Sequence, residues 1–147
     1  MKIFDNPNAE LRSKFGQYQI AVLGDVVAVS AEGIADKKAI ERYGRDMMDV
    51  INKFSGKNWA FLGLLHGQAL LTKEAESALR RSIQWRALHG MALSALVTGE
   101  TVVETIVKNQ FERVYEQTGI QVKIFETEQG ALNWLAERGF NTVPHKS

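Results

Sequence analysis

The sequence predicts a layered α/β domain with a mostly parallel β-sheet that opens with an antiparallel hairpin. Residues 17–31 alternate around a Gly-Asp pair, two apolar runs cover residues 59–65 and 91–97, and helical patterns separate the later strands. The resulting order is strand, strand, helix, strand, helix, strand, helix, strand, helix. Right-handed crossovers then place the strands that are joined through helices parallel in one sheet.

The hairpin is expected over residues 17–23 and 27–31. Tyr18, Ile20 and Val22 recur at every second position of the first strand, and a Gly-Asp pair supplies a tight reversal before the second. This alternation leaves the first strand without visible protection as a sheet edge. We therefore expect residues 17–23 to be an exposed edge that can pair with a second copy of the chain, giving a homo-oligomer.

The first two helices have clear start signals. Asp36 is an N-cap residue for a helix over about residues 37–54, whose apolar side chains recur three and four positions apart. Thr72 begins the second helix, which ends before Gly90.

The third helix begins with Thr101 and Glu104, which match a capping box, and ends before Gly119. Residues 120–124 alternate again and predict a half-exposed edge strand. A last helix is expected over residues 128–138. The apolar runs at 59–65 and 91–97 are unbroken, which is typical of central strands that helices cover on both faces.

At 147 residues the chain fits one domain over residues 1–147, with a core from about 15 to 140 and loose ends at 6–13 and 141–147. The net charge of +1 gives no overall field that would favour nucleic acid. The absence of cysteine excludes disulfides, thiolate metal sites and thiol catalysis. No signal-peptide pattern or bilayer-length apolar run is present, so we expect a cytoplasmic protein without membrane insertion.

The chain closes with Ile124-Phe125-Glu126 followed by the pattern ALNWL at residues 131–135. Together with the element order and the opening hairpin, this ending resembles the SpoIIAA-like group. That group contains the STAS domains of anti-sigma-factor antagonists and small bacterial proteins called STAS/SEC14-like. The resemblance covers about residues 15–140. It implies a SpoIIAA-like fold, a regulatory or binding role in bacteria and, on the SEC14 side, a carrier of lipid or another apolar molecule.

In the antagonist branch, an Asp-Ser-Ser-Gly-like motif after the third strand carries a serine that a partner kinase phosphorylates. The matching stretch here is residues 70–74, where only Thr72 has a hydroxyl at a comparable position and the aspartate and glycine are absent. We expect Thr72 to act as an N-cap, which contributes on the order of 1 kcal/mol. Phosphorylation of Thr72 is the alternative.

The second helix carries a stripe of candidate binding residues. Arg81, Trp85 and His89 are spaced by four, so a guanidinium can stack on the indole and the imidazole can follow, as in a platform for an anion or aromatic ligand. The alternative is ordinary packing of Trp85 with charges that suit the helix dipole. Arg86 continues the apolar stripe that faces the core, and we expect its guanidinium to reach solvent at the helix end.

A second candidate site lies where the two central strands are expected to end, the usual ligand position in open α/β sheets. Backbone N–H groups at the start of the third helix could hold an anion there. The alternative is ordinary turn chemistry. The candidate residues after the two strands are His66, Gly67, Thr98, Gly99 and Thr101.

Catalytic motifs are missing from the sequence. It contains no nucleophile elbow, P-loop, dinucleotide glycine motif or His-Glu-x-x-His, and the three histidines lack metal-ligand spacing. We therefore expect no catalytic residues, no cofactor and no metal. The leading interpretation is a non-enzymatic binding or regulatory module for an unidentified protein or small ligand. The alternatives are a SEC14-like carrier and a hydrolase-type enzyme with His66 or His89 as general base.

Overall fold

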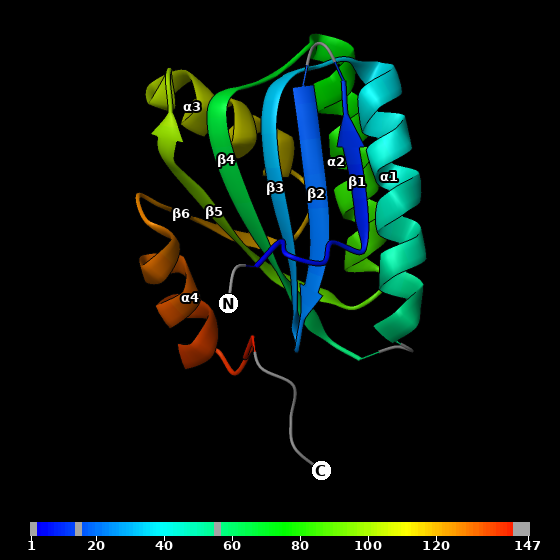
Figure 1. Cartoon of the computed structure of the whole chain (residues 1–147), viewed down its shortest axis with the longest axis vertical. Coiled ribbons are helices and arrows are strands. Elements are labelled where there is room, and N and C mark those ends of the chain that lie inside the picture. Colours follow the sequence, from blue (N-terminus) through cyan, green and yellow to red (C-terminus); the bar gives the residue numbers. More distant parts are fainter. Residues whose placement is uncertain (1–2, 14–15, 55–56, 143–147) are drawn as a thin grey trace.

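A six-stranded sheet with the strands in sequence order forms the centre of the molecule (Figure 1). The computed structural model describes residues 3–13, 16–54 and 57–142. The first three strands pair antiparallel, and the pairs from the third strand onward are parallel. The strands are β1 (Ala9–Arg12), β2 (Gly16–Leu23), β3 (Val26–Ala35), β4 (Trp59–Leu71), β5 (Met91–Thr101) and β6 (Gln121–Phe125).

Helices cover both faces of this sheet, which confirms the predicted layered α/β class. One face packs against α1 (Lys37–Ile51), the short 3₁₀ helix η1 (Asn52–Phe54), α2 (Lys73–Ala87) and α3 (Glu104–Tyr115). The other face packs against α4 (Glu128–Glu137), which lies apart from the other helices in Figure 1, and against Ile3, Phe4 and Phe140. Residues 59–65 are buried throughout, as expected of a central strand between two layers.

The predicted hairpin turn at Gly24 and the predicted N-caps Asp36 and Thr72 are confirmed. Gly24 adopts a φ of 56° in the two-residue turn between β2 and β3, a conformation that glycine accepts without strain. Asp36 accepts a hydrogen bond from the backbone N–H of Ala39, and Thr72 accepts one from that of Ala75. These bonds satisfy N–H groups that have no partner within the first helical turn.

The predicted capping box of the third helix is wrong. The helix begins at Glu104 with Val103 as its N-cap, and no side chain caps it. Thr101 belongs to the end of β5, where its hydroxyl donates to the carbonyl oxygen of Thr98 at 2.6 Å. The spacing of Thr101 and Glu104 matched the motif, but strand pairing keeps the threonine extended.

The prediction of a loose segment at residues 6–13 and an exposed edge at 17–23 is also wrong. Residues 9–12 form β1, which pairs with β2 along its free side, and the N–H of Asn8 donates to the carbonyl oxygen of Ile20 at 2.7 Å. The outer strands of the sheet are therefore β1 and β6. The premise for self-association through residues 17–23 is lost, because β2 has partners on both sides.

Two strands extend further than their apolar runs predicted. β4 continues to Leu71 and β5 to Thr101, so residues expected in loops belong to the sheet. The pairing shifts between β3 and β4, where His66 lies opposite Glu32 but Ala69 lies opposite Gly33. Two additional residues are thus accommodated in β4 as an irregular bulge.

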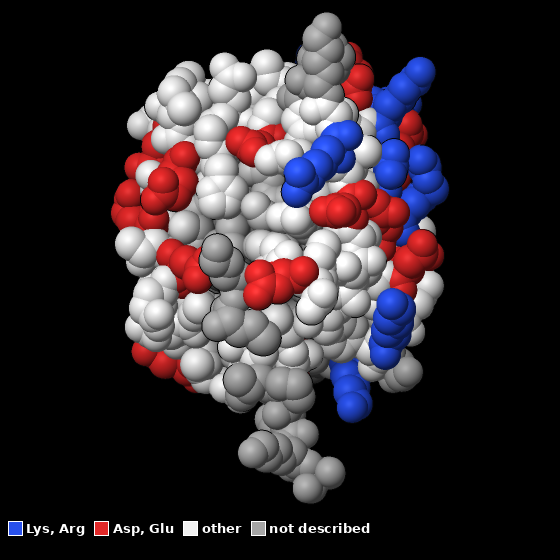
Figure 2. Space-filling view, viewed as in Figure 1, with Lys and Arg blue, Asp and Glu red and all other residues white. Residues whose placement is uncertain are grey.

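The visible surface carries no broad field of one sign. Figure 2 shows Lys and Arg mainly along the side where Figure 1 places α1, and Asp and Glu scattered over the rest of that face. In the part of the chain that the structure describes, no helix combines the length and the apolar character needed to cross a membrane.

Candidate functional site

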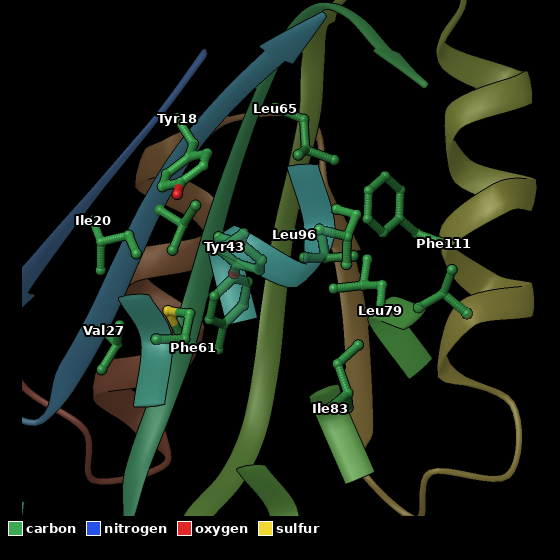
Figure 3. Packing of buried hydrophobic residues seen from close by; sticks show 14 of the residues in the cluster. Tyr18, Ile20, Val27, Tyr43, Phe61, Leu65, Leu79, Ile83, Leu96 and Phe111 are labelled. Carbon is green, nitrogen blue, oxygen red and sulfur yellow. The ribbon is translucent and has the colours of Figure 1, made fainter. Parts of the chain in front are cut away.

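A cavity of about 480 Å³ lies between the sheet and the helices α1, α2 and α3. Its wall is almost entirely aliphatic and aromatic. Figure 3 shows side chains from the strands and from the helices converging across this layer. The labelled side chains in the cavity wall are Tyr18, Tyr43, Phe61, Leu65, Leu79, Ile83, Leu96 and Phe111.

The cavity opens at the carboxyl end of β3, where the chain turns into α1 at the upper end of Figure 1. Exposed residues form this rim, whereas the residues farther in are buried. The position agrees with the general rule that open α/β sheets bind ligands beyond the carboxyl ends of their strands. The rim residues are Ser13, Gln17, Glu32, Ile34 and Asp36.

Arg86 is the charged residue at the inner end of the cavity. It is only 1% exposed, so the expectation that its guanidinium reaches solvent is wrong. The last turns of α2 pack beneath α1 and against β4, which places the guanidinium 5.2 Å from the ring centres of both Tyr43 and Phe61. Its Nη2 donates to Ser82 Oγ at 3.3 Å, and its Nε has no partner.

No carboxylate forms an ion pair with Arg86 among the residues that the structure describes. Burial raises the pKa of Tyr115 to about 12 and also raises the pKa of Tyr43, while the positive charge of Arg86 acts in the opposite direction on both. Both phenols are therefore neutral near pH 7. Neither can serve as the counter-ion of the guanidinium.

The hydroxyls of Tyr18 and Tyr115 each form a hydrogen bond with another side chain. Tyr18 donates to Asp46 Oδ2 at 2.6 Å, and burial together with this carboxylate raises the pKa of Tyr18. The hydroxyls of Tyr115 and Ser94 lie 2.7 Å apart in the core. The hydroxyl of Tyr43 is buried beside the guanidinium of Arg86, and this contact lowers the pKa of Tyr43 against the larger effect of burial.

Gln110 of α3 fixes the irregular end of β4 that contributes to the cavity wall. It is 3% exposed, its Nε2 donates to the carbonyl oxygen of Ala69, and its Oε1 accepts from the N–H of Leu71, both at 2.8 Å. Gln110 was not among the residues predicted from the sequence. Its signal was a glutamine beside Val107 and Phe111 on the apolar stripe of the helix.

Among the residues predicted as binding candidates, Arg86 is the one that the structure places in this cavity wall. Trp85 and His89 do stack, with ring centres 4.0 Å apart and planes inclined by 19°, and His89 Nδ1 lies 2.8 Å from the carbonyl oxygen of Trp85. In the described part of the chain, no cation–π contact joins the exposed Arg81 to this pair. The stack lies outside the cavity.

The strand-end candidates lie together at the carboxyl edge of the sheet but outside the cavity wall. His66 is half-buried, and its register places it between Glu32 on β3 and Glu100 on β5. Gly67 adopts a φ of 52° within the β4 bulge, which explains the need for glycine there.

The two remaining strand-end candidates with clear contacts have structural roles. Thr98 is buried and donates to Glu104 Oε2 at 3.2 Å. Gly99 lies against the carbonyl oxygen of Glu126 so closely that a Cβ would overlap it. Thr72 is held by its N-cap bond and by donation from its N–H to the carbonyl oxygen of Ala35.

No group of three or more potential metal-ligating side chains occurs within residues 3–13, 16–54 and 57–142. His145, the third histidine, lies outside the described residues. No protein-family model matches the chain, and a search of curated proteins finds no match either. The cavity and its lining therefore carry the functional argument.

Proposed function

We propose that this chain is a non-enzymatic binding module whose cavity holds an apolar small molecule. The supporting observation is the cavity of about 480 Å³ with its apolar wall. Ligand pockets typically measure about 300–1,000 Å³, and an engineered apolar cavity of about 150 Å³ already binds benzene. This cavity has room for a molecule several times larger than benzene.

An unfilled space of this size leaves the atoms of its apolar wall without packing partners. Water is a poor filler because the wall offers few polar partners, whereas an apolar ligand restores the missing contacts.

This cavity favours a small ligand over a protein partner as the molecule that the module recognises. It also favours the carrier role that the SEC14-like resemblance implies, within a SpoIIAA-like protein of the bacterial cytoplasm. A carrier needs a ligand site with an opening, and the rim at Ile34 and Asp36 supplies one.

Native mass spectrometry of the gently purified chain tests this function, and we expect a retained small molecule. Ligand-free protein should then bind the neutral fluorophore N-phenyl-1-naphthylamine with a rise in emission. Ala31→Phe should weaken this binding at least tenfold because Ala31 lies in the cavity wall. Ala136→Phe is the matched control, since it adds the same atoms to an exposed position on α4.

Two results would contradict the proposal. One is a clean apo mass combined with no fluorophore binding by ligand-free protein. The other is equal loss of binding in Ala31→Phe and Ala136→Phe, which would place the fluorophore on a surface outside the cavity.

A further inference from the structure

We propose that the ligand of this cavity is an apolar carboxylic acid whose carboxylate binds the guanidinium of Arg86. This inference rests on the proposed function and names the chemical class of the ligand. A buried cation borders the cavity, and none of the described carboxylates forms an ion pair with it.

The contacts that Arg86 makes within the protein do not offset its burial. Removal of a charged group from water is unfavourable even after the protein relaxes, and arginine side chains remain charged in proteins. Cation–π contacts with Tyr43 and Phe61 and the contact with the Tyr43 hydroxyl offset part of this cost, but all of these partners are neutral. The bond to Ser82 is long, at 3.3 Å, and Nε is left without an acceptor. A bound anion would provide the missing acceptors.

Carboxylate is the anion that this geometry suits best. The planar guanidinium presents a fork that binds a carboxylate through two parallel N–H···O bonds, which are stronger than bonds between neutral groups. One neutral donor, the hydroxyl of Tyr43, is buried near the same guanidinium and can donate to a carboxylate oxygen. The wall between Arg86 and the polar rim is mainly apolar, so we expect the part of the ligand beyond the carboxylate to be apolar as well.

The position of Arg86 also defines the orientation of the ligand. Phe61, over which the guanidinium lies, comes four residues before Leu65 on β4, a separation of about 13 Å along an extended strand. The rim at Ile34 and Asp36 lies beyond Leu65, at the carboxyl end of the neighbouring strand. The carboxylate is therefore innermost and the apolar body extends toward the opening.

Calorimetric titration of the ligand-free full chain tests this inference with two matched pairs of probes at pH 7.5. Dodecanoate is compared with dodecan-1-ol, and 2-naphthoate with 2-naphthol. We expect at least one acid to bind tenfold or more tightly than its neutral partner, and the pair that responds distinguishes an aliphatic from an aromatic ligand. Arg86→Met should reduce the affinity of that acid to the level of the alcohol and leave the alcohol unchanged. Arg81→Met, an exposed arginine on the same helix, should retain the preference.

The thermal stability of the ligand-free variants separates a binding role from a structural one. Arg86→Met should melt at the same or a higher temperature than the original chain, because it removes a buried charge without a counter-ion. If the Met variant does not fold, Arg86→Lys keeps the charge but loses the fork, and should weaken acid binding severalfold with alcohol binding unchanged.

Equal affinity for acid and alcohol in the original chain, or a preference that survives in Arg86→Met, would overturn the carboxylate inference and leave the apolar binding function in place. Binding of N-phenyl-1-naphthylamine without binding of either acid would overturn it as well. Failure of all five probes would overturn both proposals.

Discussion

The two faces of the sheet differ in how completely they are packed. Against α4, small strand residues such as Ala28, Ala60 and Ala95 let Trp134 and Leu135 approach closely, and this layer is a dense core. Against α1, α2 and α3, the layer contains most of the large aromatic side chains, a buried arginine and a cavity of about 480 Å³.

Burial and close packing are therefore separate properties in this protein. Residues on both faces are excluded from solvent, yet the cavity described above lies on one of them. Gly63 contributes to that space, since it places no side chain on the cavity side and a Cβ there would lie 2.7 Å from a methyl carbon of Leu96. We infer that the α4 face contributes mainly stability and the opposite face accepts a stability cost for binding.

The largest expected contrast comes from two leucine truncations. Leu135→Ala, in the dense layer, should lower the free energy of unfolding by about 3–5 kcal/mol because it creates a new void. Leu79→Ala should cost about half as much, since Leu79 already borders the cavity and has fewer contacts to lose. Urea unfolding of the ligand-free variants measures both values. Equal losses would show that the two faces are packed alike.

Alkaline pH should destabilise the cavity side selectively, because all three tyrosines of the chain lie there. Burial raises the pKa of Tyr115 from 10.0 to about 12, so the folded state keeps this proton longer than the unfolded state does. The contribution of Tyr115 to the free energy of unfolding is therefore complete below pH 10 and is lost as the pH rises toward 12. At about 1.4 kcal/mol per unit, the loss from this residue is on the order of 3 kcal/mol.

Urea midpoints between pH 8 and pH 12 check this dependence. Tyr115→Phe should flatten the decline above pH 10, although it also leaves Ser94 without its 2.7 Å partner and so lowers stability at every pH. The slope is therefore the informative quantity. A variant whose stability declines as steeply as that of the original chain would exclude Tyr115 as the source.

Two alanines on β3 offer the most direct test of free space, since Ala28 faces α4 and Ala31 lines the cavity. Ala28→Leu should destabilise the protein by about 1–3 kcal/mol through overpacking. Ala31→Leu should be neutral or stabilise the ligand-free protein by up to about 1 kcal/mol, because its added carbons fill a void. Thermal melts compare the two variants. A similar loss of stability in both variants would mean that the space beside Ala31 is already filled in solution.

Much of the fold could be predicted because its signals are local. Apolar residues at every second position predicted the hairpin, and apolar residues three and four positions apart predicted the four helices. The unbroken apolar run at 59–65 indicated a strand buried on both faces. β1 was missed because only Ala9 and Leu11 of its four residues are apolar, too few for a pattern. The strand ends were missed because polar residues such as His66 remain paired by neighbouring strands in spite of their composition.

The cavity could not be predicted, because a void depends on how the volumes of three helices and the sheet add up in space. Helical periodicity indicates which residues face inward, such as Tyr43, Leu79 and Phe111, but carries no information on the gap among them. Arg86 was the available signal. Its spacing from Leu79 and Ile83 indicates an inward-facing position on α2. We expected the guanidinium to reach solvent, but Tyr43 of α1 packs against it and keeps it buried.

The smallest predicted effects concern helix starts, and they test whether the two faces differ only in packing. Thr72 caps α2 on the cavity side and Thr127 caps α4 on the dense side, with hydrogen bonds of 3.2 and 3.1 Å to backbone N–H groups. Thr72→Ala and Thr127→Ala should each cost about 1 kcal/mol, because a cap acts within one turn and does not sense the layer beneath it. Serine at either position should restore most of the loss, and urea unfolding measures all four variants. A clearly larger cost at Thr72, or loss of ligand binding in Thr72→Ala alone, would mean that the start of α2 is coupled to the cavity, since Leu71 beside it lines the wall.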